Sequence, residues 1–284
     1  MTDPFRSAAR VALSTAIVLV AMTWSGVARS DETINLDYDF YGNGIRVLTL
    51  GFDASVTDRA YKARYALKTK GLASLFSDGS TIAVAQGAIR RDSVAVRQFE
   101  SESDNDKGKR VVTITWDERR NAKTVRSYDL GSRKSSSIRK ALEPGIPDPV
   151  SAMLQATLFD AGKPCESAFT VYDGRHVFEL RYAYQGRGTV SSDNGLYSGP
   201  AYKCTLTYKP VAGLSKSKMR KAREEPQPPF TIWLAPFKSP GLGQELLIPV
   251  RAEGRMKWAN LEIYLRKGKV AGSPLTPTEL ARNQ

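Results

Sequence analysis

Apolar and polar residues alternate along most of this chain with a period of two, the pattern of β-strands that bury one face. The first such stretch, LDYDF, covers residues 36–40 and is followed by a turn of Gly42, Asn43 and Gly44. The same alternation predicts strands at 45–54, 61–68, 81–87, 94–101, 110–116, 124–129, 202–208, 230–234, 244–251 and 258–267. Because short, turn-rich links separate these runs, the pattern indicates a mainly β protein with an antiparallel sheet.

A hairpin is predicted in the stretch FTVYDGRHVFELRYAY, residues 169–184, because Asp173-Gly174 is a strong signal for a tight turn. A two-residue turn places Tyr172 opposite Arg175 and Val171 opposite His176. One face of the pair then collects the aromatic and aliphatic side chains, while the other face carries polar ones. We therefore expect this hairpin to cover a core with its apolar face.

One helix is predicted among the strands. Asp148 is a good N-cap and Pro149 suits the first turn of a helix. The residues that follow at helical spacing are Val150, Met153, Leu154, Thr157 and Leu158. We expect this short helix to be wrapped by a strongly curved antiparallel sheet or half-barrel. Two other segments give weaker patterns: 71–78 suits a turn of helix, and 131–146 is interpreted as a polar surface connection.

The two ends of the chain differ from the rest. Residues 1–30 have Arg6 and Arg10 before an apolar run, and small residues around Ala28, which together are the three regions of a secretory signal peptide. Residues 31–267 then form a single β-rich domain, and residues 268–284 a polar C-terminal tail. We therefore expect an exported protein that is periplasmic, and soluble after cleavage of the signal peptide.

Cys165 and Cys204 are the two cysteines of the chain. In the alternating pattern, both cysteines fall on the apolar face of their strands. Because cysteines of exported proteins usually form disulfides, we predict one disulfide between them. Closing a loop of about forty residues would stabilise the fold by roughly 4 kcal/mol. Two cysteines and one histidine supply too few soft ligands for a metal site, and we expect no cofactor.

The net charge of +13 is high for a globular protein. Such a charge would ordinarily suggest nucleic acid as a partner, but export argues against it and favours anionic lipid or cell-wall surfaces. The densest cations lie in one run, which comprises Lys216, Lys218, Arg220, Lys221 and Arg223. This run is either a solvated loop or frayed helix between strands, or a contact to an anionic envelope surface.

Signals for catalysis are weak. His176 is the single histidine, so any mechanism that pairs histidine with serine or cysteine must use it. The sequence has no G-x-S-x-G, P-loop or HExxH motif. A pair of carboxylates assembled in space stays open as an alternative. We expect a protein that is not an enzyme.

The aromatic side chains on the predicted inner faces allow two interpretations. They form either the core of a curved sheet or a groove that accepts an acyl chain. The side chains expected to line such a groove are Met153, Leu154, Phe169, Phe178, Tyr182 and Tyr208.

Five stretches of the chain resemble domain-of-unknown-function family 3108, a family of exported proteobacterial proteins. They are YDFYGNGIRVLTLGFDASV, DPVSAMLQATLF, FTVYDGRHVFELRY, YSGPAYKCTLTYKPVAGL and IPVRAEGRMKWANLEIYLRK. The resemblance spans nearly the whole chain after residue 30. It implies a periplasmic location and a mostly antiparallel β architecture, and it transfers no catalytic residues.

Three hypotheses for the function follow. The first is a non-enzymatic periplasmic protein, a binding or scaffolding module of the cell envelope whose partner is an envelope protein or an amphiphile. The second is a carrier of lipid or lipoprotein acyl chains in the concave face of the sheet. The third is an envelope hydrolase that uses His176 or a carboxylate pair.

Overall fold

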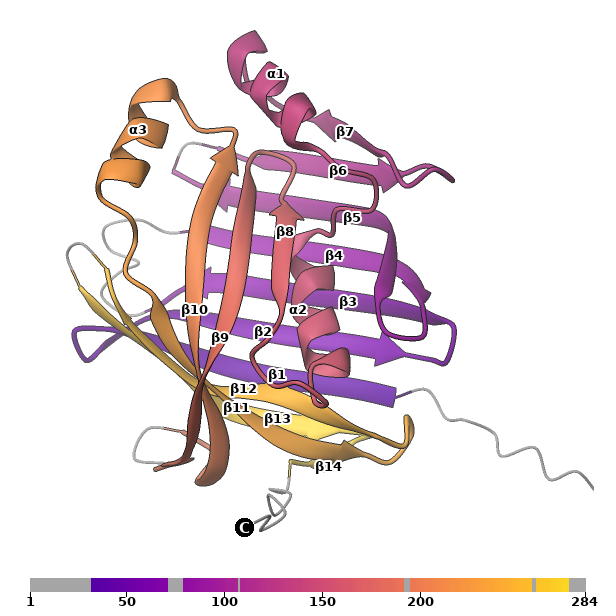
Figure 1. Ribbon diagram of the computed structural model, residues 1–284, viewed down its shortest axis with the longest axis vertical. Helices are drawn as coiled ribbons and strands as arrows, with labels where there is room; N and C mark the ends of the chain where they lie inside the picture. Colours follow the sequence, from indigo (N-terminus) through magenta and orange to yellow (C-terminus); the bar gives the residue numbers. More distant parts are fainter. Residues whose placement is uncertain (1–31, 71–78, 107, 192–194, 257–258, 276–284) are drawn as a thin grey trace, which may run out of the picture.

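The computed structural model describes residues 32–70, 79–106, 108–191, 195–256 and 259–275, and every strand among them joins one antiparallel sheet (Figure 1). The first half of the chain contributes β1 (Glu32–Gly42), β2 (Ile45–Val56), β3 (Ala60–Thr69), β4 (Gly79–Ile89), β5 (Val94–Asn105), β6 (Arg110–Trp116) and β7 (Ala122–Arg126). The second half contributes β8 (Ala168–Tyr172), β9 (Val177–Val190), β10 (Gly199–Ala212), β11 (Phe230–Ser239), β12 (Gln244–Arg255), β13 (Asn260–Val270) and β14 (Ser273–Pro274). The helices are α1 (Ser132–Ala141), α2 (Pro149–Phe159) and α3 (Lys216–Glu224). The mainly β class is confirmed.

β1 lies in the middle of the sheet, because it pairs with β2 on one side and with β13 on the other. Ile34, for example, lies opposite Ala54 of β2 and Val270 of β13. The full order is β7-β6-β5-β4-β3-β2-β1-β13-β12-β11-β10-β9-β8, and β14 pairs with β13. The two halves of the chain therefore extend in opposite directions from β1, and β7 and β8 are left as the two edges.

The sheet curls until its two edge strands meet through side chains. Arg126 of β7 donates from Nε to the Gly174 carbonyl, at 2.5 Å, and from Nη2 to the Tyr172 hydroxyl, at 2.6 Å. Thr124 lies 3.1 Å from the same hydroxyl. Gly174 has a positive φ and packs so closely on Val112 of β6 that a Cβ would not fit there. These contacts close one end of the expected half-barrel without a β-ladder.

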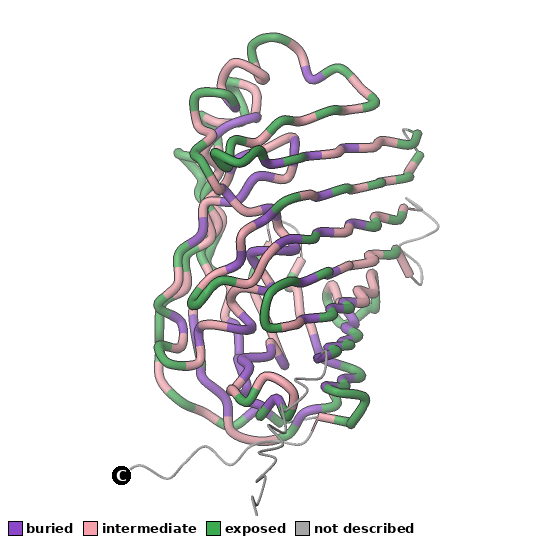
Figure 2. Tube along the Cα trace, turned by 90° about the vertical axis from the view of Figure 1, so that its right-hand side faces the viewer, coloured by how far each residue is buried: buried purple, intermediate pink, exposed green. Residues whose placement is uncertain are grey.

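α2 fills part of the concave side of this sheet. The Asp148 carboxylate accepts hydrogen bonds from the Val150 and Ser151 amides, at 2.9 and 3.0 Å, so it caps the helix as the sequence predicts. Val150, Leu154 and Leu158 are buried in the main core, and α2 contacts β3, β4, β5, β8 and β12. Figure 2 shows buried positions alternating with less buried ones along several strands of the sheet.

The β8–β9 hairpin has a longer turn than the sequence suggests. Tyr172 lies opposite Val177, not Arg175, and Val171 lies opposite Phe178, not His176. The Asp173 carboxylate makes the difference, because its Oδ1 accepts hydrogen bonds from the amides of Arg175 and His176 and holds four residues in the turn. The register moves by two residues, so each strand residue keeps its predicted face while His176 leaves the strand.

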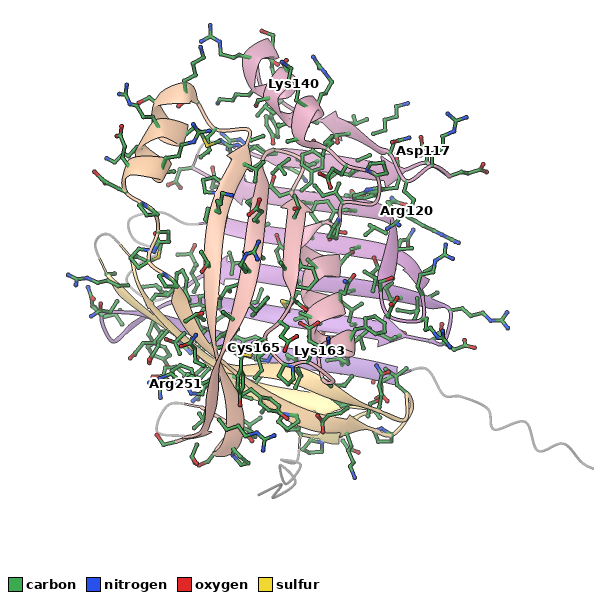
Figure 3. The ribbon with its side chains drawn as sticks, viewed as in Figure 1. Asp117, Arg120, Lys140, Lys163, Cys165 and Arg251 are labelled. Atoms are coloured by element: carbon green, nitrogen blue, oxygen red, sulfur yellow. A yellow bond between two sulfur atoms is a disulfide. The ribbon has the colours of Figure 1, made fainter. Side chains whose placement is uncertain are left out.

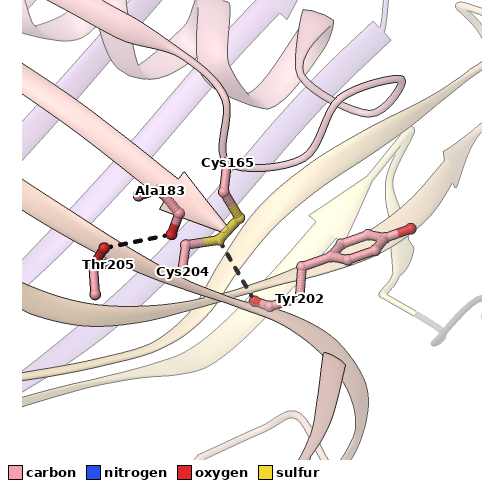
Figure 4. Close-up of a disulfide and its surroundings, with 5 residues drawn as sticks. All are labelled: Cys165, Ala183, Tyr202, Cys204 and Thr205. Carbon is pink, nitrogen blue, oxygen red and sulfur yellow. Dashed lines mark hydrogen bonds between the residues drawn. A yellow bond between two sulfur atoms is a disulfide. The ribbon is translucent and has the colours of Figure 1, made fainter. Parts of the chain in front are cut away.

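The disulfide between Cys165 and Cys204 is confirmed (Figure 4). Both cysteines are fully buried, and their Cα atoms are 5.8 Å apart. They belong to a small apolar cluster with Tyr202, Ile232, Leu234 and Leu247. The bond therefore ties the link that follows α2 to the middle of β10, between elements that share no β-ladder.

Several expectations need correction or lie outside the described residues. The polar connection at 131–146 contains α1. The basic run after β10 forms the helix α3, and a helix was one of the forms that the sequence allowed. β13 continues to Val270 and pairs with β14, so the sheet includes residues that the sequence assigns to a tail from 268. The expected signal peptide, the helical turn at 71–78 and Trp258 lie outside the described residues.

Candidate functional site

α3 is a cationic helix that buries none of its side chains. The Ser215 hydroxyl accepts a hydrogen bond from the Lys218 amide at 3.3 Å and so caps the first turn. The five cations predicted to contact an anionic surface all lie on α3 and are all exposed: Lys216, Lys218, Arg220, Lys221 and Arg223. A helix that buries no side chain contributes little to the core, so its charges face solvent, with Arg220 lying 3.8 Å from Glu224 of the same helix.

α1 supplies a second cationic helix beside the first. Its four cations are Arg133, Lys134, Arg139 and Lys140, and its one buried side chain is Ile138. α1 and α3 lie at the same end of the molecule and both contact β10 (Figure 1). The Gly213 amide donates to the Ser137 hydroxyl of α1 at 3.3 Å, which links the two helices through the end of β10. Figure 3 shows Lys140 at the outer end of the molecule.

A groove of about 830 Å³ lies between α1 and α3. Its cationic lining comes from both helices and consists of Arg133, Lys134, Lys216, Arg220 and Arg223. Its apolar lining consists of Leu130, Val211, Ala212, Leu214 and Met219, and the remaining residues are serines and one glycine. No residue of this lining is acidic. The groove therefore combines a positive rim with an apolar surface.

The amino ends of both helices reach this groove. Residues 131–134 at the start of α1 and 214–216 at the start of α3 line it. Gly131, at the N-cap of α1, has no side chain that could accept hydrogen bonds from the amides of the first turn. Neither helix has an acidic residue in its first turn. The free amides and the helix macrodipole add to the positive potential of the side chains.

The groove predicted on the concave face is only partly open. Leu154 and Phe169 are buried, so they belong to the core around α2. Met153, Phe178, Tyr182 and Tyr208 are half-buried. Phe178 and Tyr208 pack with their ring centroids 5.2 Å apart, and burial raises the pKa of Tyr182 to about 12. The structure thus places four of the six predicted side chains where they retain some exposure.

His176 lies in the β8–β9 turn, where its Nδ1 is 3.2 Å from the Asp173 carboxylate. Asp173 also accepts hydrogen bonds from two amides of the same turn, so Asp173 and His176 together stabilise the turn. Among the described residues, no serine, threonine or cysteine is hydrogen-bonded to the other ring nitrogen of His176, which a nucleophile would require. In the part of the chain that the structure describes, the contacts of His176 are those of the turn.

The carboxylates that stand out are enclosed. The Ser151 hydroxyl lies 2.5 Å from Asp148 and 2.7 Å from the Tyr61 hydroxyl, and Asp148 and Ser151 are fully buried. Burial raises the pKa of Asp148 to about 6, although the hydrogen bonds from Ser151 and Val150 act in the opposite direction. Because no substrate can reach this network in the folded protein, its role is to cap α2.

Asp39 is buried between Arg46 and Arg266, with a distance of 3.4 Å to each. Within the described ranges, no group of three or more histidine, cysteine or acidic residues could hold a metal ion. The helices of the described segments are all too short or too polar to span a membrane.

The residues that sequence reasoning missed are Arg133 and Lys134. They precede a run of three serines at 135–137. Because serine lowers helix propensity, the segment 131–146 gave no helical pattern. A signal was present in the two pairs of adjacent cations at 133–134 and 139–140, but only the tertiary structure brings them next to α3.

Comparisons with known proteins identify a family and no activity. A family model described as "Protein of unknown function (DUF3108)" matches residues 35–266. Among solved structures, the chain is similar to a "Beta-barrel-like Protein of Domain of Unknown Function DUF1849 from Brucella abortus", with 10% sequence identity and a TM-score of 0.43. That match covers 84% of this chain and 97% of the other. No curated protein matches the chain.

Proposed function

The chain belongs to the DUF3108 family of proteins of unknown function, and we propose that it is a non-enzymatic binding module of the cell envelope that docks on an anionic surface. The observation that carries the proposal is the placement of two cationic helices, α1 and α3, at one end of the molecule. α1 has four cations and no acid, and α3 has five cations and one acid.

Charge distribution supports this role more than total charge does. The whole chain carries a net charge of +13, and these two helices of ten and nine residues hold more than half of it. A basic residue near an anionic lipid surface contributes on the order of 1 kcal/mol to binding. If all nine side chains reach the surface they contribute roughly 9 kcal/mol, enough for salt-sensitive docking, and if only half of them do, the contribution falls to roughly 4 to 5 kcal/mol.

Location in the periplasm is part of the proposal. It is supported by the signal-peptide pattern of residues 1–30 and by the disulfide, since disulfides persist in oxidising compartments. In such a compartment the anionic surfaces available to a basic protein are lipid headgroups and cell-wall polymers. The proposal names lipid headgroups, because the groove between the helices also offers apolar surface.

Vesicle co-sedimentation tests the docking. The purified chain should bind vesicles of phosphatidylglycerol and phosphatidylcholine, and should bind vesicles of phosphatidylcholine alone at least about tenfold more weakly. Binding should fall steeply between roughly 50 and 500 mM salt. The double variant Lys218→Gln with Lys221→Gln removes two exposed cations of α3 and should weaken binding about thirtyfold.

The matched control is Lys62→Gln with Lys163→Gln, which removes two exposed cations that lie on neither cationic helix and do not line the groove (Lys163 is labelled in Figure 3). The control should keep vesicle binding within about threefold of the unmodified chain, since its charges lie away from the docking end. Equal losses in the two double variants would show that the net charge, and not this end of the molecule, drives binding.

A further inference from the structure

We infer that the groove between α1 and α3 is a binding site for one anionic amphiphile, a phosphate headgroup carried on an alkyl chain. The inference rests on the proposed function in that it uses the same end of the molecule, but it concerns a single bound molecule and not a surface. The groove is about 830 Å³, within the range of roughly 300 to 1,000 Å³ that is typical of small-molecule sites.

The headgroup half of the site is formed by groups that favour a phosphate. Arg133 and Lys134 reach the groove from α1, and Arg220 and Arg223 reach it from α3. Arginine presents a planar fork of donors that matches phosphate oxygens, and the hydroxyls of Ser132 and Ser215 add donors, whereas that of Ser137 donates to the Lys134 carbonyl. The first-turn amides of α1 lack a side-chain acceptor, which leaves them available to the same anion.

The tail half of the site is the apolar lining. Leu130 is buried below the groove, and Val211, Leu214 and Met219 are half-buried along it. Methionine adapts to chains of irregular shape, and each buried methylene of a tail contributes about 0.8 kcal/mol. An inorganic anion would leave this surface in water, so the groove favours a ligand that has both a charge and a chain.

The opposite side of α3 provides an internal contrast. A smaller pocket of about 400 Å³ lies there against Lys218, Lys221 and Arg255. Its lining includes the acid Glu225, followed by Pro226, Gln227 and Pro228, and its apolar residues are Ala222 and Met256. The side of α3 that faces α1 therefore offers the larger groove, and its lining has five cations and no acid.

The site can be tested by isothermal titration calorimetry, with dodecyl phosphate added below its critical micelle concentration. The intact chain should bind dodecyl phosphate at least about tenfold more tightly than either dodecyl maltoside, which lacks the charge, or inorganic phosphate, which lacks the chain. Equal affinity for dodecyl phosphate and inorganic phosphate would overturn the inference, because the apolar lining would then contribute nothing.

Two variants locate the bound molecule. Arg133→Gln with Arg223→Gln removes one exposed cation from each wall and should weaken dodecyl phosphate binding by about tenfold or more. Met219→Ser changes the apolar lining and should weaken binding of dodecyl phosphate while leaving that of inorganic phosphate unchanged. The Lys62→Gln, Lys163→Gln control should bind both as the unmodified chain does. Unchanged binding in the Arg133, Arg223 variant would place the ligand elsewhere.

The same proteins separate this inference from surface docking. Lys218 and Lys221 do not line the groove, so their double variant should lose vesicle docking and keep most of its affinity for dodecyl phosphate. Docking on vesicles without binding of dodecyl phosphate would sink the single-molecule site alone. Binding of dodecyl phosphate without a preference for anionic vesicles would sink the docking function and leave the groove.

Discussion

α2 and α3 are helices of similar length on the same sheet, and they differ in nearly every other respect. α2 has eleven residues, six of them buried, and its N-cap Asp148 is fully enclosed. α3 has nine residues, none of them buried, and its N-cap Ser215 lies near solvent. The contrast teaches that α2 is part of the core that shapes the sheet, while α3 is a platform, a surface helix that presents charged side chains to solvent.

The largest effect on stability should come from removing the disulfide, which ties the link after α2 to β10. Replacing both Cys165 and Cys204 with alanine should lower the free energy of unfolding by about 4 kcal/mol, because the bond closes a loop across a sequence separation of 39. Urea unfolding with and without reductant measures this. Reductant should destabilise the unmodified chain and have no effect on the double variant.

Truncating one side chain on each helix compares directly how much α2 and α3 contribute to stability. Leu154→Ala on α2 should cost about 3 to 4 kcal/mol, because this side chain is fully buried and leaves a cavity. Met219→Ala on α3 is the matched change and should cost less than about 1 kcal/mol, since the side chain is half-buried. Similar urea midpoints for the two variants would contradict the division into core and platform.

The pH dependence of stability should distinguish the two caps. The pKa of Asp148 is raised from 3.8 to about 6 by burial, so the folded chain holds this proton more tightly than the unfolded chain. The contribution of Asp148 to stability is therefore fully present below about pH 4 and is lost as the pH rises through 6. Asp148→Asn keeps a capping side chain and removes this titration.

Unfolding curves at several pH values check this difference. Relative to Asp148→Asn, the unmodified chain should lose up to about 3 kcal/mol between pH 4 and pH 7, from a shift of about two pKa units. A constant difference between the two proteins across this range would show that the carboxyl group does not titrate in the folded state.

The smallest effect belongs to the exposed cap. Ser215→Ala removes the acceptor of the Lys218 amide at the start of α3 and should cost less than about 1 kcal/mol of global stability. Its influence should instead be local, because α3 packs so little. Hydrogen exchange at the amides of α3 should quicken, while exchange in α2 stays unchanged.

The helix and strand positions were largely predictable, because they depend on local pattern. β6 runs from Arg110 to Trp116 as predicted, and α2 begins at Pro149 after Asp148. The β8–β9 register was wrong by two residues, because the turn depends on a side-chain hydrogen bond of Asp173 and on the packing of Gly174 against Val112. Neither contact leaves a periodic trace in the sequence.

The candidate site was predictable only in part. The cations of α3 stand in one run, and their exposure follows from having no apolar partner stripe. Arg133 and Lys134 lie about eighty residues earlier, in a serine-rich segment with no clear period. Their place opposite α3 depends on where β7 and β10 end in space, so the groove could not be read from either segment alone.

The sequence by itself determined the alternating strands, the capped α2 and the two cysteines on apolar faces, since each depends on neighbours within a few residues. The tertiary structure alone decided that β1 pairs with β13, that Arg126 joins the two sheet edges and that α1 and α3 line one groove. These arrangements join residues far apart in the chain. They follow from how the whole sheet twists and buries its apolar face, which no local pattern encodes.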